Sequence, residues 1–308
     1  MAIKNIAVLG AGNMGREIAL HFAQNGYKVS LYSRTTETLD DSFIQIVNNI
    51  TLMQEYGLLK DKKAIENIYR FTSVKDAVCD ADLVIETVKE DRDIKKLIIE
   101  EADRYAPEGA YLTSDTSALN IFEFLEVSRP EKTVITHFFN PASVMPLVEI
   151  VRGDKTSDET VNEIKAFLER TGKTPIVLSK CIPGFAANRL TLAMAREAFH
   201  LVNEGFISVE DVDKIITTTF GPRYIFEGIF DLYDIIGIDV GYAVASGLTK
   251  ELANSPDVPE LLKKQYESGN LGLKTGKGFK DYSDITAEEY AVKRNEKILK
   301  SMKFKKSI

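Results

Sequence analysis

A glycine-rich turn near the start of the chain constrains its fold more than any other feature. Gly10, Gly12 and Gly15 follow the apolar run IAVLG and open the amphipathic stretch MGREIALHFAQNG. A G-x-G-x-x-G turn between a strand and a helix is typical of a unit that binds the pyrophosphate of a dinucleotide. A glycine-rich turn without a ligand is the alternative. The residues expected at the phosphates are Gly10, Gly12, Asn13, Met14 and Gly15.

Short apolar runs alternate with helical patterns through the first half of the chain. KVSLY, ADLVIET, AYLTSD and TVITHFF are bounded by turn residues, which is typical of strands. This alternation predicts an α/β fold of the Rossmann type, with a parallel sheet and helices on both of its faces. Residues 36–70 are more numerous and more charged than one crossover requires. We expect a helical arm there, formed by a helical hairpin that reaches away from the sheet.

The pattern changes near CIPGF, residues 181–185. Downstream, AANRLTLAMAREAFHLVNEG and VEDVDKIITTT have the helical period. We therefore predict two domains, a dinucleotide-binding domain over residues 1–182 and an all-α domain over residues 183–308. The final stretch EEYAVKRNEKILKSMKFKKSI is predicted to be a solvated, basic amphipathic helix, with a membrane anchor as the alternative.

The length and charge of the chain restrict its partners. Its 308 residues suffice for two domains, and a net charge of −7 argues against nucleic acid or an anionic membrane as the main partner. No apolar run approaches the roughly 20 residues of a membrane span, and no signal segment precedes the first strand pattern. Cys79 and Cys181 provide neither a disulfide framework nor metal-ligand spacing. We expect a cytoplasmic protein that acts on a small molecule and binds no metal.

The second predicted strand ends without the acid that usually holds the ribose of NAD. KVSLY is followed by Ser33, Arg34 and Thr35. An Asp at Ser33 would repel a 2′-phosphate, whereas these hydroxyls can donate hydrogen bonds to it and Arg34 can pair with its charge. The sequence therefore favours NADP(H) as the cofactor. The alternative is NAD(H), with Arg34 a solvated surface arginine.

Only three histidines are available for imidazole chemistry. His21 lies in the first predicted helix and His200 in the helical half, where structural or solvated roles are expected. His137 stands at the end of the predicted strand TVITHFF, where open α/β sheets bind their ligands. His137 is therefore the candidate for catalysis.

Five motifs link the chain to a known family. GAGNMG, SDTSAL, HFFNPASVMPLVEIV, PGFAANRL and GLKTGKGF occur in this order over nearly the whole chain. Together they resemble the 3-hydroxyacyl-CoA dehydrogenase family. The resemblance implies that His137 removes the proton of the substrate hydroxyl while hydride leaves C3 for the nicotinamide, and that Glu149 pairs with His137. It also implies that Ser117 and Asn188 contact the substrate oxygen, and that the helical domain forms a homodimer.

The resemblance extends to the cofactor. It assigns cofactor contacts to Glu90 and Lys95, which follow ADLVIE, and to Asn140 of HFFNP and Lys274 of LKTG. From the residues alone, Glu90, Lys95 and Lys274 are equally compatible with solvated charges. Asn140 before Pro141 is also a common turn former.

Four departures from the family pattern bear on the substrate. Acyl-CoA members have Asp at Ser33, a basic residue at Tyr56 of the CoA-binding arm, and M-K-L-V-E where this chain has Met145, Pro146 and Leu147. The second domain shows GIFDLYDIIGID in place of Gly-Pro-x-E-L-x-D. Just upstream, GPRYIFEG resembles relatives that oxidise free hydroxy acids such as gulonate and carnitine, and its arginine is Arg223.

Three readings of the function follow. An acyl-CoA substrate comes first, with Lys60, Lys62 and Lys63 replacing the lost basic contact. A free hydroxy acid, bound through Arg223, is the main alternative, although Arg223 is equally compatible with a structural ion pair. A cofactor-binding protein without turnover is a more remote alternative, because a non-catalyst has no need of a base and its orienting carboxylate.

Overall fold

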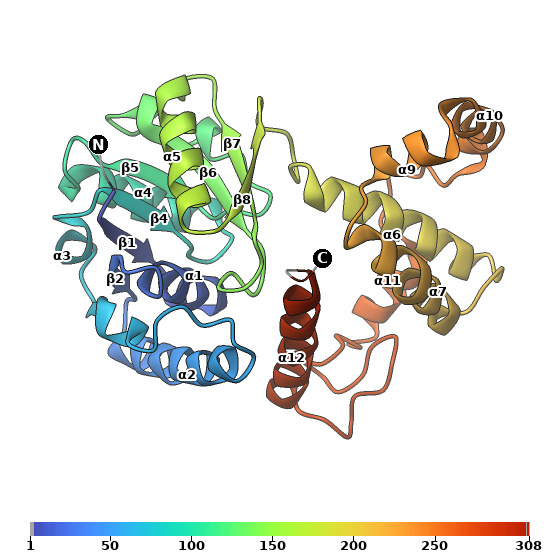
Figure 1. Cartoon of the computed structure of the whole chain (residues 1–308), viewed down its shortest axis with the longest axis horizontal. Helices are drawn as coiled ribbons and strands as arrows, with labels where there is room; N and C mark the ends of the chain where they lie inside the picture. Colours follow the sequence, from blue (N-terminus) through green and yellow to red (C-terminus); the bar gives the residue numbers. More distant parts are fainter. Residues whose placement is uncertain (1–2, 306, 308) are drawn as a thin grey trace. The chain divides into compact units, whose positions relative to one another are not determined.

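The computed structural model describes residues 3–305 and 307, which form two compact units (Figure 1). The first unit extends to Ala187 and the second begins at Asn188. The predicted boundary lies a few residues earlier, after residue 182. The difference has a local cause, because the N–H groups of Ala186 and Ala187 donate hydrogen bonds to Glu149 of the first unit.

The first unit is built on an eight-stranded sheet with the order β3-β2-β1-β4-β5-β6-β7-β8. Its strands are β1 (Asn5–Leu9), β2 (Lys28–Tyr32), β3 (Ile68–Phe71), β4 (Leu83–Glu86), β5 (Tyr111–Ser114), β6 (Thr133–Phe138), β7 (Leu147–Arg152) and β8 (Thr174–Leu178). All neighbouring strands are parallel except β6 and β7, which pair antiparallel. The prediction of a largely parallel Rossmann-type sheet is confirmed.

Helices cover both faces of this sheet. On one face, Phe22 of α1 (Asn13–Ala23) stacks on Phe167 of α5 (Asp158–Arg170) with ring centroids 5.4 Å apart. Phe138 of β6 meets Phe22 edge-on from the sheet. On the other face, α3 (Val74–Val78) and α4 (Arg92–Tyr105) pack on alternate residues of β1, β4 and β5 in a continuous apolar cluster. Because successive strand residues point to opposite faces, β1 and β2 contribute to both layers and contact α1 as well as α3.

The glycine turn joins β1 to α1 in a very confined space. Gly10 has a φ of +126°, a conformation that strains residues with a side chain. A Cβ at Gly15 would overlap the carbonyl oxygen of Gly10. The Gly10 N–H donates to the carbonyl of Tyr32 at 3.0 Å, so the turn lies beside the end of β2.

The expected helical hairpin over residues 36–70 is wrong. One helix, α2 (Thr36–Glu55), occupies its first part, and the 3₁₀ turn Ala64–Asn67 then leads into strand β3. Ile68 is buried on the sheet, where it pairs with Val29 of β2. The other residues of this strand include the exposed Tyr69 and Arg70, so β3 lacks the apolar run that marked the equally short β4 and β5 in the sequence.

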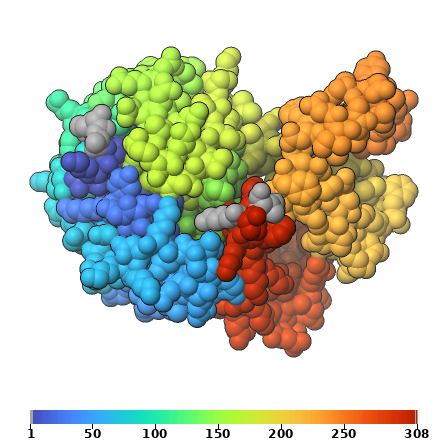
Figure 2. All heavy atoms as spheres, viewed as in Figure 1, coloured from blue at the N-terminus to red at the C-terminus, as the bar shows by residue number. Residues whose placement is uncertain are grey.

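The second unit is helical, as predicted. Its helices are α6 (Ala187–Asn203), α7 (Val209–Ile215), α8 (Gly221–Tyr224), α9 (Ile229–Ile236), α10 (Ile238–Leu248), α11 (Glu260–Glu267) and α12 (Ala287–Lys305), with a π-helical turn at Ile216–Phe220. The predicted terminal helix is thus confirmed as α12. Within residues 3–305 and 307, no helix combines the length and the apolar character needed to cross a bilayer. Figure 2 shows α9 and α10, in orange, as a lobe that stands out from the other helices of this unit.

Candidate active site

The antiparallel pairing of β6 and β7 places His137 directly opposite Glu149. Directly opposed side chains point to the same face of a sheet. The Nδ1 atom of His137 lies 2.8 Å from Oε2 of Glu149, and the two side chains are 8% and 0% exposed. On this face Ile135 and Val151 pack with Phe185, which covers the imidazole edge-on at 5.6 Å. The predicted base and its predicted carboxylate therefore form a buried pair.

The second oxygen of Glu149 is also satisfied. Its Oε1 accepts hydrogen bonds from the N–H groups of Ala186 and Ala187, at 2.9 and 2.8 Å, where α6 begins. Free N–H groups at a helix N-terminus favour a negative charge. A carboxylate can only accept hydrogen bonds, so the Nδ1 atom of His137 carries the proton and donates to Glu149. The other ring nitrogen, Nε2, is then the one that can take up a proton. This arrangement is suited to proton abstraction from a hydroxyl group.

The N-terminus of α1 is suited to hold phosphate. The Ncap residue Gly12 makes no side-chain cap, whereas α2, α4 and α5 are capped by Thr35, Asp91 and Ser157. The first-turn N–H groups of α1 therefore lack the side-chain acceptor that the other three helices have. Backbone N–H groups at a helix start form an anion site together with the helix dipole. Asn13 and Met14, the first two residues of α1, lie at this predicted phosphate site.

The end of β2 lies next to that turn. Ser33 is half-buried and its N–H donates to the carbonyl of Phe71, while the side chain of Arg34 is exposed. No acid within residues 3–305 and 307 forms an ion pair with Arg34. The Thr35 hydroxyl accepts from the Thr38 N–H as the N-cap of α2, so part of its hydrogen-bonding capacity is used within the protein. Arg34 is therefore the group at this strand end that remains available to an anion.

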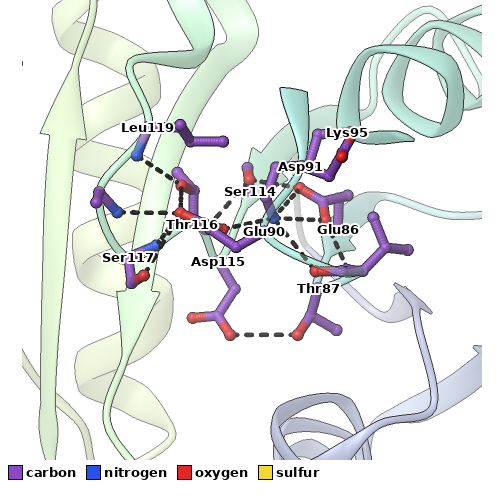
Figure 3. A network of polar contacts seen from close by, with 12 residues as sticks. Glu86, Thr87, Glu90, Asp91, Lys95, Ser114, Asp115, Thr116, Ser117 and Leu119 are labelled. Atoms are coloured by element: carbon purple, nitrogen blue, oxygen red, sulfur yellow. Dashed lines mark hydrogen bonds and ion pairs between the residues drawn. The ribbon is translucent and has the colours of Figure 1, made fainter. Parts of the chain in front are cut away.

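Glu90 fixes the loop that contains Ser117 (Figure 3). Its Oε1 accepts from the Thr116 hydroxyl at 2.6 Å and from the N–H groups of Ser117 and Ala118 at 3.1 and 3.2 Å. Burial raises the pKa of the Glu90 carboxyl, but the hydrogen bond from Thr116 and the charge of Lys95 outweigh it, and the net shift is downward. The predicted cofactor acid and the predicted substrate serine thus lie in direct contact.

Lys95 is enclosed by two carboxylates. Its side chain is 1% exposed, and its ammonium group pairs with Glu86 at 2.9 Å and with Glu90 at 3.2 Å. Its contact with the cofactor stays a prediction. Glu86, the last residue of β4, was missed by sequence analysis because a charged strand end is ordinarily solvated.

Asp115 was also missed. It follows β5, and its carboxylate accepts from the N–H of Phe138, the residue after His137, at 2.7 Å. Its other oxygen lies 3.3 Å from the Thr87 hydroxyl. Burial raises the pKa of the Asp115 carboxyl well above its usual range. Asp115 therefore ties the strand of the candidate base to the neighbouring strand.

The remaining predicted residues lie at the surface of one unit or the other. Asn140 is exposed in the loop after β6. Asn188 lies in the first turn of α6, Arg223 is half-buried in α8, and Lys274 is exposed in the turn that the Gly272–Lys277 bridge closes. The Nε of Arg223 donates to the carbonyl of Thr219 at 3.3 Å. The roles of these four residues stay predictions.

Comparison with known proteins gives a family match over both units. Residues 5–181 match the model of the 3-hydroxyacyl-CoA dehydrogenase, NAD binding domain, and residues 184–282 match that of the 3-hydroxyacyl-CoA dehydrogenase, C-terminal domain. The chain is 34% identical over 291 residues to a probable 3-hydroxybutyryl-CoA dehydrogenase of Bacillus subtilis, covering 93% of this chain and 100% of that protein.

Two further relatives have names without a CoA substrate. The chain is 31% identical over 299 residues to 5-formyl-3-hydroxy-2-methylpyridine 4-carboxylate 5-dehydrogenase of Mesorhizobium japonicum, covering 96% of each chain. It is 31% identical over 306 residues to L-carnitine dehydrogenase of Oceanobacillus iheyensis, covering 97% of each. A crystal structure of the pyridine-carboxylate type of enzyme, described as an NAD+ dependent dismutase, superposes with a TM-score of 0.90 at 30% identity, over 98% of this chain and 97% of that one.

The His137–Glu149 pair generates a first prediction. His137→Gln should lower kcat by about 10²–10⁴-fold while leaving cofactor affinity nearly unchanged, because the amide cannot accept the hydroxyl proton. Steady-state rates and a fluorescence titration with the cofactor measure the two effects. His200→Gln, on α6, is the matched control and should keep its activity. A His137→Gln variant that keeps more than about a tenth of kcat in a chemistry-limited assay would contradict the assignment.

Proposed function

This chain belongs to the 3-hydroxyacyl-CoA dehydrogenase family, and we propose that its substrate is a hydroxy acid with a free carboxylate group. It is an oxidoreductase that acts on a CH–OH group. The buried His137–Glu149 pair is the observation that supports catalysis, since it provides a base of defined tautomer. The nicotinamide, when bound, supplies the acceptor or donor of hydride.

The proton chemistry follows from the residues of the first unit. In the oxidative direction, Nε2 of His137 takes the proton of the substrate hydroxyl, and Glu149 stabilises the resulting imidazolium through Nδ1. In the reductive direction the same imidazolium returns the proton to the carbonyl oxygen. The Ser117 N–H donates to Glu90 at 3.1 Å, and its hydroxyl donates to the same oxygen at 3.4 Å. When the substrate binds, this hydroxyl turns to donate a hydrogen bond to the substrate oxygen instead.

The charge of the α2 arm supports a substrate without CoA. Coenzyme A carries a 3′-phosphate and a diphosphate, so its site needs cations. Helix α2 contains no Lys or Arg and has four acids, Glu37, Asp40, Asp41 and Glu55. The ammonium group of Lys60 donates to Oδ1 of Asn25 and to the carbonyl of Thr171, at 2.8 and 3.1 Å, which commits it to the fold. Of the three lysines proposed to bind CoA, Lys62 and Lys63 are thus the two that remain available to its phosphates.

Arg223 is the proposed partner of the substrate carboxylate. Within the described residues it forms no ion pair with an acid. The structural ion pair that the sequence left open for Arg223 is therefore not formed there. A planar guanidinium group matches a carboxylate in a bidentate geometry. The names of the pyridine-carboxylate and carnitine relatives, whose lengths match this chain, support the same substrate class.

An acyl-CoA substrate is the second candidate. It is supported by the 34% identity to a probable 3-hydroxybutyryl-CoA dehydrogenase. The two candidates share the base, the orienting carboxylate and Ser117, and they differ only in what holds the far end of the substrate. A comparison of rates on the free acid and on the thioester therefore separates them.

The substrate class can be tested on the wild type and on Arg223→Ala. We expect turnover of a free hydroxy acid, with L-carnitine and 3-hydroxybutyrate as first probes, in preference to 3-hydroxybutyryl-CoA. Arg223→Ala should lower kcat/KM for the acid by about 10–100-fold, because a charge-assisted hydrogen bond is lost. Arg223→Lys, which keeps the charge without the planar fork, should lose less. Turnover of the thioester alone, unaffected by Arg223→Ala, would establish the acyl-CoA candidate.

For the cofactor, the match to an NAD binding domain and the NAD+ dependent relative support NAD(H), whereas the residues at the end of β2 lead us to propose a preference for NADP(H). The exposed Arg34 and the absence of an acid at Ser33 support a 2′-phosphate at the end of β2. Ser33→Asp combined with Arg34→Ala should reverse the preference, costing NADPH about 10–100-fold in affinity. Titration with both cofactors, followed by their fluorescence, measures the ratio.

Arg70→Ala is the matched control for that titration. Arg70 is also a surface arginine on the arm side of β2, but it pairs with Asp40 at 2.6 Å. Its replacement should leave the ratio of the two affinities unchanged. A wild type that binds NADH as tightly as NADPH, or more tightly, would contradict the proposed role of Arg34.

We propose that the enzyme is a homodimer through the second unit. Helices α9 and α10 expose several large apolar side chains, among them Phe230 at 86%, Tyr242 at 75% and Ile235 at 69%. Monomeric proteins rarely leave such a surface to water, and a second copy of the same surface is the simplest cover for it. Light scattering after size exclusion should give twice the chain mass for the wild type and less for Phe230→Asp. A wild type that is monomeric at micromolar concentration would contradict the dimer.

A further inference from the structure

A closed set of polar contacts is connected to the Ser117 loop (Figure 3). We call it the Glu86 ring, and its members are Glu86, Lys95, Glu90, Thr116 and Ser114. Lys95 forms ion pairs with both Glu86 and Glu90. The Thr116 hydroxyl donates to Glu90, and the Thr116 N–H donates to Oγ of Ser114. The Ser114 hydroxyl donates to Glu86, which closes the ring. The ring connects the ends of β4 and β5 to the start of α4.

Glu86 is the buried end of this ring. Its side chain is 0% exposed, so it has no surface to offer a substrate or a cofactor. Its oxygens accept from Lys95 at 2.9 and 3.2 Å, from the Val88 N–H at 2.6 Å and from the Ser114 hydroxyl at 2.5 Å. Burial raises the pKa of the Glu86 carboxyl, while Lys95 and Ser114 act in the opposite direction. A buried carboxylate with this many donors is held in one position.

Glu90 is the exposed end. One of its oxygens faces Lys95 at 3.2 Å, and the other accepts from the Thr116 hydroxyl and from the N–H groups of Ser117 and Ala118. Glu90 is 37% exposed, so water competes for it, and its position depends on the ammonium group of Lys95. Lys95 in turn is fixed by Glu86, because both groups are excluded from water.

We propose that Glu86 is a positioning residue for the reaction: through Lys95 and Glu90 it fixes the loop that places the Ser117 hydroxyl. The inference rests on the contact between Ser117 and the substrate oxygen proposed above. A hydrogen-bond donor stabilises a developing charge only when it is held in place beforehand. Small displacements of such a group have large effects on rate. Glu86 thus influences the reaction without touching any reacting group.

Thr116 links the Glu86 ring to the Ser117 loop through a second set of hydrogen bonds. Its hydroxyl donates to Glu90 and accepts from the Leu119 N–H at 3.0 Å. The backbone on both sides of Ser117 is therefore bonded to members of the ring. Loss of the ring would release Thr116, Ser117 and Ala118 together.

A double-mutant cycle tests the proposal. Glu86→Leu combined with Lys95→Met removes both buried charges at once, so that neither is left without its partner. Ser117→Ala is then made in the wild type and in this ring-deficient background. We expect Ser117→Ala to lower kcat/KM by about 10–100-fold in the wild type, and less than about threefold in the ring-deficient background, because the serine is no longer placed.

The outcomes separate this proposal from the proposed function. Equal losses in the two backgrounds would mean that Ser117 acts without the ring, and the positioning role of Glu86 would be overturned. If Ser117→Ala has no effect in the wild type, the substrate contact of Ser117 fails instead. Ser114→Ala, which removes only the hydroxyl between Glu86 and Thr116, provides the same comparison in a variant with little change in volume.

Amide hydrogen exchange gives a readout that needs no substrate. In the ring-deficient protein the N–H groups of Ser117, Ala118 and Leu119 should exchange about tenfold faster or more, because their acceptors are released. The Phe138 N–H, which is bonded to Asp115, is the internal control and should keep its rate. Unchanged exchange at Ser117 and Ala118 would overturn the proposal irrespective of the activity data.

Discussion

The buried Glu149 carboxylate joins three parts of the first unit: strand β7, the imidazole of His137 on β6, and the backbone where α6 begins. A buried charge is tolerated only when its oxygens are satisfied, and here an imidazole and two N–H groups satisfy them. The antiparallel register of β6 and β7 supplies the first partner, and the turn after Cys181 supplies the others. The contact that fixes the tautomer of the base therefore also fixes the end of the first unit.

Local features of the fold could be predicted from the sequence, and features that depend on distant partners could not. The glycine turn is readable because Gly10 and Gly15 are required by the backbone itself. His137 and Glu149 were found through their motif, whereas the antiparallel pairing that brings them together has no local pattern. Strand β3 was missed because it lies at the edge of the sheet, where two of its four residues are exposed and no apolar run marks it. Glu86 was missed because a charged strand end is ordinarily solvated, and Asp115 because its partner Phe138 lies 23 residues away in the sequence.

Asp115, Glu86 and Glu149 are three buried carboxylates of the first unit, and each has different partners. Asp115 accepts hydrogen bonds from a backbone N–H and a threonine hydroxyl and forms no ion pair within the described residues, and burial raises its pKa strongly. Glu86 has an ammonium partner that offsets part of the same effect. Glu149 faces an imidazole and the start of a helix. The same burial that raises the pKa of both Asp115 and Glu86 is thus opposed at Glu86 by the charge of Lys95.

The residues proposed for proton transfer are buried, whereas most of those proposed to select the cofactor or substrate are exposed or half-buried. His137 and Glu149 are buried, as are all members of the Glu86 ring except Glu90. A change in any of these buried residues leaves a buried polar group unsatisfied. Arg34, Lys62 and Lys63 are exposed, so a substitution at any of them should have little effect on the fold. The departures from the family pattern at Ser33 and Tyr56 fall on half-buried positions outside the His137–Glu149 pair and the Glu86 ring. A fold with this arrangement can exchange one cofactor or acid for another while the proton relay remains unchanged.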